Sequence, residues 1–171
     1  MITDLLTTEE YHPYYEGYIN KATSIGIKEG LQTNLKEIMD FLSKLPKEKE
    51  DYAYAKGKWT VKDILLHIID AERVFAYRAL RIGRGDETPL AGFEQDDYVE
   101  QGKAANRSFE SLIEEYESVR KATISLFKSF DDKTLLLMGK ASGSSVSVRA
   151  LGYIITGHEN HHMQVIKERY L

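Results

Sequence analysis

The segment Ser147–Tyr170, SVRALGYIITGHENHHMQVIKERY, is the most informative part of the chain about the fold, because it combines a long helical pattern with most of the histidines. Ser147 is a favourable residue to cap the start of a helix. His158 and His162 stand four residues apart, which puts them on one helix face about 6 Å apart along the axis. Apolar residues share or flank that face, so both imidazoles are expected to point into a protein core.

Three further segments place apolar residues at the three- and four-residue steps of an amphipathic helix. They cover residues 27–42, 60–82 and 108–130. The apolar stripe of the third is expected to contain Leu112, Tyr116, Val119, Thr123 and Leu126. Four such helices, with no convincing strand pattern, predict an all-α protein in which residues 1–171 form a single four-helix-bundle domain.

Two connections between these helices differ in composition. Residues 84–107, after the second helix, form a long connection with a short helix expected near 96–101. Long connections inside a compact domain often carry function. Residues 139–147 are rich in Gly and Ser, and we expect them to form a loop.

Composition excludes several classes of function. The chain has 171 residues and a net charge of -4, which gives no electrostatic reason to bind nucleic acid or an anionic membrane. The absence of cysteine excludes disulfides, thiolate metal sites and a cysteine nucleophile. The first residues, MITDLL, do not resemble a signal peptide, and no apolar run approaches the roughly 18 residues of a membrane span. A cytoplasmic location is therefore expected.

The segment Gly157–His162, GHENHH, contains the H-E-x-x-H signature of zinc proteases, in which Glu159 would act as the general base. In those proteases the third metal ligand comes from well downstream of the histidine pair. Here nine residues follow His162, and their sole carboxylate, Glu168, lies on the same helix. The protease interpretation therefore lacks a third ligand and is disfavoured.

A third ligand is available upstream, in the second predicted helix. His67 lies in the sequence LLHIID, so its neighbourhood is expected to be core. Facing helices of a bundle commonly supply metal ligands from an i,i+4 pair and a single residue. His67, His158 and His162 would then form a three-nitrogen site with open positions for water, which is the catalytic pattern for zinc and also suits nickel or iron. The alternative is that these are core histidines bonded to backbone or carboxylate groups.

Three stretches resemble the DinB/YfiT-like family of metal-dependent enzymes. They are Gly57–Phe93, GKWTVKDILLHIIDAERVFAYRALRIGRGDETPLAGF, Ser145–His162, SVSVRALGYIITGHENHH, and the ending VIKERYL. The N-terminal EYHPYYEGYI is similar to one branch of the family, and the resemblance covers nearly the whole chain. One departure is Val165, because the family often has Gln three residues after the last ligand.

The resemblance implies a four-helix bundle that holds one divalent metal, zinc or nickel, on His67, His158 and His162. It also implies a homodimer and a small-molecule substrate. Some family members are thiol S-transferases that use a low-molecular-weight thiol, and others are hydrolases. The expected function is therefore a metal-dependent enzyme in which the metal activates water or a thiol. The alternative is a non-catalytic bundle in which the metal only joins two helices.

Four other residues are candidates for roles beside the metal. Asp70, one turn beyond His67, could orient an imidazole or accept a proton from metal-bound water, and Glu159 remains a weaker candidate base. Arg78 could bind an anionic substrate, and Tyr15 could line a pocket. Each also has an ordinary structural explanation, in surface ion pairs or aromatic packing.

Overall fold

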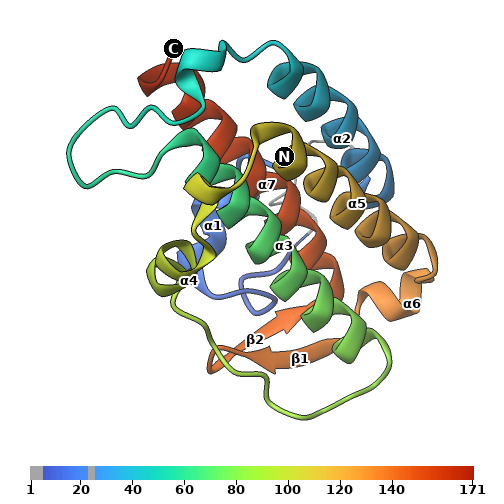
Figure 1. Ribbon diagram of the computed structural model, residues 1–171. Helices are drawn as coiled ribbons and strands as arrows, with labels where there is room; N and C mark the ends of the chain where they lie inside the picture. Colours follow the sequence, from blue (N-terminus) through green and yellow to red (C-terminus); the bar gives the residue numbers. More distant parts are fainter. Residues whose placement is uncertain (1–5, 23–25) are drawn as a thin grey trace.

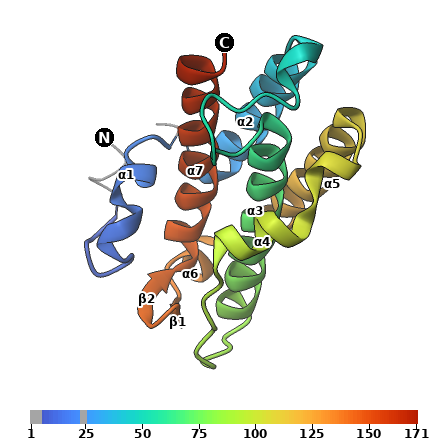
Figure 2. The ribbon, with the colours of Figure 1, turned by 60° about the vertical axis from the view of Figure 1, so that its left-hand side comes forward.

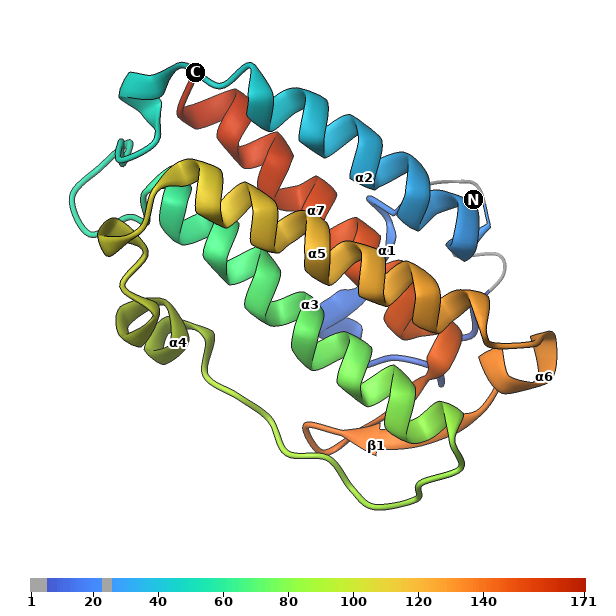
Figure 3. The ribbon, with the colours of Figure 1, turned by 45° about the vertical axis from the view of Figure 1, so that its right-hand side comes forward.

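A computed structural model describes residues 6–22 and 26–171 and shows four long helices packed side by side (Figure 1). They are α2 (Ile27–Ser43), α3 (Val61–Gly83), α5 (Phe109–Lys128) and α7 (Val148–Arg169). Both α2 and α3 pack against α5 and α7, so the helices close into a ring in the order α2, α5, α3, α7 (Figure 3). The predicted four-helix bundle is confirmed. No helix in the described ranges is long and apolar enough to cross a bilayer.

Side-chain caps fix where the last three long helices begin. Thr60 and Asp63 form a reciprocal capping box, in which each side chain accepts a hydrogen bond from the other's backbone N–H. The hydroxyl oxygens of Ser108 and Ser147 accept hydrogen bonds from the N–H groups three residues later, at 3.1 and 3.0 Å. These local bonds satisfy N–H groups that a helix start leaves unpaired. The predicted starts of these helices are therefore confirmed.

A layer of buried polar side chains divides the apolar core into two clusters. Each long helix contributes one residue to the polar layer: Asn34, Glu72, Arg120 and Glu159. The guanidinium of Arg120 donates to Glu72 at 2.8 Å and to Glu159 at 3.0 Å. The buried stripe of α5 therefore passes through Arg120 and Phe127. The predicted stripe is corrected, because Val119 and Leu126 are only partly buried. An arginine can occupy a core position because the two carboxylates pair with it.

The segment expected to be a loop forms a β-hairpin. Strands β1 (Met138–Ala141) and β2 (Ser144–Ser147) pair antiparallel. Ser142 and Gly143 connect them with φ angles of 52° and 79°, as the two-residue turns that match the twist of a hairpin require. The strands are only four residues long, and β2 does not alternate buried and exposed residues, so no pattern in the sequence separated them from a loop.

An N-terminal segment covers one side of α7 (Figure 2). It contains a 3₁₀ turn (Pro13–Tyr15) and the short helix α1 (Glu16–Ile19), which packs on α7. The backbone of this segment approaches so closely that a Cβ atom on Gly157 would overlap the carbonyl oxygen of Tyr18. Glycine at position 157 therefore allows the segment to lie directly over the neighbouring histidine of α7.

The long connection after α3 is ordered by contacts with the hairpin and with α3. The backbone N–H of Leu90 donates to the carbonyl of Lys140, and Ser142 donates back to Leu90. Helix α4 (Gln95–Gly102) then packs on α3 and is followed by a 3₁₀ turn (Ala104–Asn106), so the predicted short helix is present. The remaining short elements are a 3₁₀ turn at Lys47–Lys49 and α6 (Asp132–Leu135).

Candidate metal centre

Three imidazoles from two helices converge between α3 and α7. The Nε2 atom of His158 lies 3.0 Å from Nε2 of His67 and 3.1 Å from Nε2 of His162. One ring nitrogen from each residue falls within 4.8 Å of the other two. His158 and His162 meet because a four-residue step returns to the same helix face. His67 joins them because α3 and α7 are neighbours in the bundle.

Burial keeps all three imidazoles neutral. His67 and His158 are only 4% and 5% exposed, and His162 is half-buried. Burial lowers the pKa of His67 to about 4 and the pKa of His162 to about 3, and it holds the pKa of His158 well below the ordinary value. A neutral imidazole offers a lone pair to a cation, which a protonated one cannot do.

The geometry of this cluster fits a divalent metal ion. Zinc binds imidazole nitrogen at about 2.0–2.1 Å in a tetrahedron, which places the ligand atoms about 3.3 Å from one another. The two Nε2 distances to His158, 3.0 and 3.1 Å, need to lengthen only slightly to match. Among the described residues, no fourth His or carboxylate joins the cluster. This set of donors therefore leaves coordination positions for water or substrate.

In protein stripped of metal, stability should fall as the pH drops below about 6.5, the pKa of histidine in an unfolded chain. Because the folded protein holds the pKa of His67 near 4, the unfolded chain takes up a proton first in this window. The free energy of unfolding therefore decreases with falling pH, by about 3 kcal/mol for His67 alone. Urea titrations between pH 7 and pH 4.5 measure this slope. It should flatten in the double variant His67→Leu/His162→Leu, and an equally steep slope there would contradict the assignment.

Aromatic rings enclose the imidazoles. The Trp59 ring centroid lies 4.9 Å from that of His67 and 6.5 Å from that of His162. On the other side, the rings of Tyr18 and Phe75 lie 5.1 and 6.0 Å from the ring of His158. These contacts fix the orientation of the imidazoles and limit the access of water.

Two cavities reach the cluster from different sides. One of about 240 Å³ is lined by His67 and His158, and one of about 380 Å³ is lined by His162 and Trp59. Asp96, in the first turn of α4, borders both cavities, and its charge acts against the lowering of the pKa of His67. No sequence pattern indicated a role for Asp96, because acidic residues are common in the first turn of any helix. Only the packing of α4 on α3 brings it to the site.

The two predicted catalytic carboxylates are paired with arginines, and neither lines the two cavities that reach the cluster. Glu159 is fully buried in the polar layer, where its oxygens accept hydrogen bonds from Tyr116, Arg120 and Asn34. One residue along a helix turns by about 100°, so Glu159 faces the inside of the bundle while His158 faces Tyr18. Asp70 pairs at 3.5 Å with Arg73, which also binds Glu115 of α5 at 2.5 Å.

The two predicted substrate-binding residues both line cavities. Tyr15 borders the cavity that contains His67 and also a separate cavity on the hairpin side. Arg78 borders the cavity on the hairpin side but not the one that contains His67, and it lies eleven residues beyond His67 on α3. Neither residue contacts the three imidazoles, so neither belongs to the metal cluster itself.

Comparisons with known proteins agree with this arrangement. A family model described as the DinB superfamily matches residues 31–166. A candidate metal-dependent hydrolase of Oceanobacillus iheyensis is 24% identical over 140 residues, which cover 80% of this chain and 79% of that protein. The solved structure of YfiT from Bacillus subtilis, described as a probable metal-dependent hydrolase with an unusual four-helix bundle topology, superposes with a TM-score of 0.69. The superposition covers 93% of this chain and 91% of YfiT, at 16% identity, and it shows a shared fold.

The family match extends over most of the bundle and includes both helices that carry the converging histidines. It thereby covers the part of the chain that forms the bundle. This chain belongs to the DinB superfamily.

Proposed function

We propose that this protein is a metal-dependent hydrolase of small molecules whose His67, His158 and His162 hold one divalent ion. The observation that carries the proposal is the convergence of three neutral imidazole nitrogens beside two cavities. The Oceanobacillus relative supports it, because its description also names a metal-dependent hydrolase. A bound divalent ion would supply Lewis acidity, which lowers the pKa of water toward about 7.

We assign the proton-accepting role to the carboxylate of Asp96. Hydrolysis requires a group that takes a proton from the attacking water and later returns one to the leaving group. The carboxylates of Glu159 and Asp70 form ion pairs with arginines, whereas Asp96 is exposed and borders both cavities. Because this exposed carboxylate borders the cavities, it would be able to exchange protons with solvent between turnovers.

The open side of the cluster argues against a metal that only joins two helices. A structural zinc site normally holds four protein ligands, whereas three ligands are typical of a catalytic site. The described residues contribute three, and the cavities lead to the side where further ligands would bind. The thiol S-transferase activity, the choice between zinc and nickel, the homodimer and the cytoplasmic location stay predictions.

Reloading experiments test the proposed function. Protein purified without a His-tag, stripped with a chelator and reloaded with zinc or nickel should hydrolyse members of a panel of small esters and amides only when metal is present. Asp96→Asn should lower the rate roughly 100- to 10,000-fold, the usual range for losing a general base, while metal content stays unchanged. The exposed neighbour Asp97 provides the matched control, and Asp97→Asn should keep full activity. Full metal occupancy with no hydrolysis of any panel member would favour the structural role instead.

A further inference from the structure

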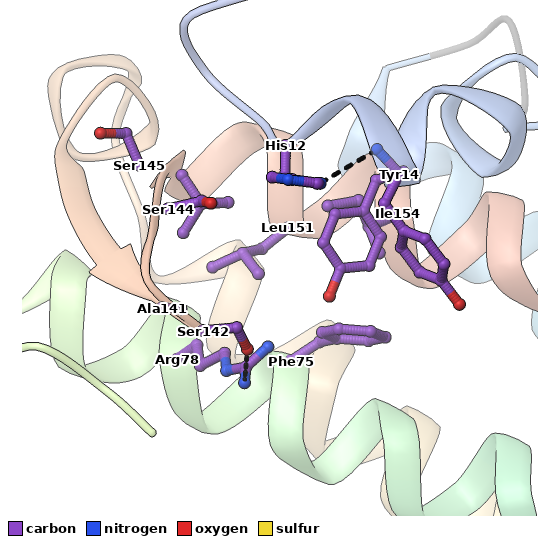
Figure 4. A pocket seen from close by; sticks show the side chains of 12 residues that line it. His12, Tyr14, Phe75, Arg78, Ala141, Ser142, Ser144, Ser145, Leu151 and Ile154 are labelled. Atoms are coloured by element: carbon purple, nitrogen blue, oxygen red, sulfur yellow. Dashed lines mark hydrogen bonds between the residues drawn. The ribbon is translucent and has the colours of Figure 1, made fainter. Parts of the chain in front are cut away.

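A cavity of about 240 Å³ lies next to the metal centre, between the N-terminal segment, the hairpin and helices α3 and α7 (Figure 4). Phe75 and Arg78 of α3 lie on one side of it, across from His12 and Tyr14 of the N-terminal segment. The other lining residues are small or apolar apart from Tyr15: Ala141, Ser142, Ser144, Ser145, Val146, Leu151 and Ile154. Its walls therefore suit an apolar group.

Arg78 brings a buried positive charge to this apolar cavity. The residue is only 3% exposed, and its Nη2 donates to the carbonyl of Ala91 and to the hydroxyl of Ser142, both at 2.9 Å. Among the residues that the structure describes, no carboxylate lies within ion-pair distance of Arg78, and none lines the cavity. Arg120, the other buried arginine, is paired with two carboxylates. A buried cation without a counter-ion favours the binding of an anion.

The cavity and the metal centre lie along one face of α3. His67, Ala71, Phe75 and Arg78 are separated by steps of four, four and three residues, which keep to one helix face. Phe75, Tyr14 and Tyr15 line both this cavity and the one that contains His67 and His158. Eleven residues of α helix span about 16 Å. An elongated small molecule could therefore place one end at each site.

We propose that this cavity binds the carboxylate-bearing, apolar end of the substrate, with the carboxylate on Arg78 and the apolar part against Phe75, Leu151 and Ile154. The proposal rests on the proposed function, because the opposite end of the molecule would reach the three histidines. Pockets for whole small molecules measure roughly 300–1,000 Å³, so a cavity of about 240 Å³ fits one arm of a substrate. A single guanidinium with a neighbouring hydroxyl matches a monoanionic carboxylate better than a phosphate dianion, which requires more donors.

Binding of 3-phenylpropionate and of its neutral amide tests the site without knowledge of the reaction. Calorimetry on the metal-loaded protein should show that the acid binds at least about 10-fold more tightly than the amide, the usual value of a hydrogen bond to a charged group. Arg78→Gln should abolish this preference. Arg84→Gln provides the matched control, because Arg84 is an exposed arginine at the C-terminal end of the same helix and does not line the cavity. It should preserve the preference.

A His158→Ala variant separates this site from the metal centre. Because Arg78 would hold the acid, the His158→Ala protein should still prefer the acid to the amide as strongly as the wild type does, even if no metal is present. Loss of binding in His158→Ala, together with unchanged binding in Arg78→Gln, would place the carboxylate on the metal and overturn the proposal. Val146→Phe fills the cavity and leaves Arg78 intact, so it should lower the affinity for the acid at least about 10-fold. This variant tests the site independently if Arg78→Gln does not fold. Equal binding of acid and amide by the wild type would overturn the proposal as well.

Discussion

Replacing His158 by Ala is expected to remove the bound metal. His158 is the central ligand, because its Nε2 lies 3.0 Å from that of His67 and 3.1 Å from that of His162. Its loss leaves two nitrogens on different helices with no donor between them. Changes to residues that only support a ligand already cost about 10- to 100-fold in metal affinity, so the loss of a direct ligand should cost at least as much. Elemental analysis and chelator competition on protein purified without a His-tag measure the effect.

His161 is the matched control for this prediction. It is a neighbour of His162 on α7, but its ring packs against Tyr18 and it is not part of the cluster. His161→Ala should therefore keep about one metal ion per chain. His67→Ala should lose affinity to a similar extent as His158→Ala, because it removes the ligand from α3. A folded His67→Ala protein with wild-type affinity would contradict the three-histidine site.

Replacing Arg120 by Leu is expected to destabilise the fold by about 3–5 kcal/mol, the usual cost of removing one partner from a buried ion pair. Arg120 is fully buried and is held by Glu72 and Glu159, which are also buried. The substitution would leave two carboxylates facing a Leu side chain in the middle of the bundle. Chemical denaturation followed by circular dichroism measures the free energy of unfolding.

A surface ion pair provides the comparison. Arg73 pairs with Asp70 and Glu115 but is half-exposed, so Arg73→Leu should change the free energy of unfolding by no more than about 1 kcal/mol. Replacing all three members of the buried set, as Glu72→Leu/Arg120→Met/Glu159→Leu, should recover most of the loss, because no unpaired charge then remains. Arg120→Leu protein as stable as the wild type would show that the polar layer contributes little.

Several features of the bundle could be predicted from the sequence because they depend on neighbours within one helix. The three- and four-residue spacing of apolar residues indicated the four long helices, and Thr60, Ser108 and Ser147 indicated where three of them begin. The spacing of His158 and His162 placed both imidazoles on one face. The prediction for α5 was wrong at two positions, because Arg120 and Phe127 are buried where Val119 and Leu126 were expected. A fully buried arginine is indistinguishable in sequence from an exposed one.

The hairpin and the roles of the carboxylates required the tertiary structure. Strands β1 and β2 have four residues each and form through pairing with each other and with Leu90, which no local pattern indicates. Glu159 stands beside a histidine in sequence, yet its carboxylate turns to Arg120 of a different helix. Asp96 borders the cavities beside the histidines because α4 packs back on α3.

Local sequence patterns were enough to predict a bundle of amphipathic helices with two inward-facing histidines one turn apart, because helical periodicity and capping act over a few residues. Which side chains from different helices lie together depends on tertiary packing. The ring order of the helices sets His67 against His158 and buries Arg120 between two glutamates. It also places Arg78 beside a cavity near the metal centre that no carboxylate of the described residues lines. These contacts depend on the orientation of each helix about its own axis. That orientation is set by packing against all the neighbouring helices, so it cannot be read from one segment.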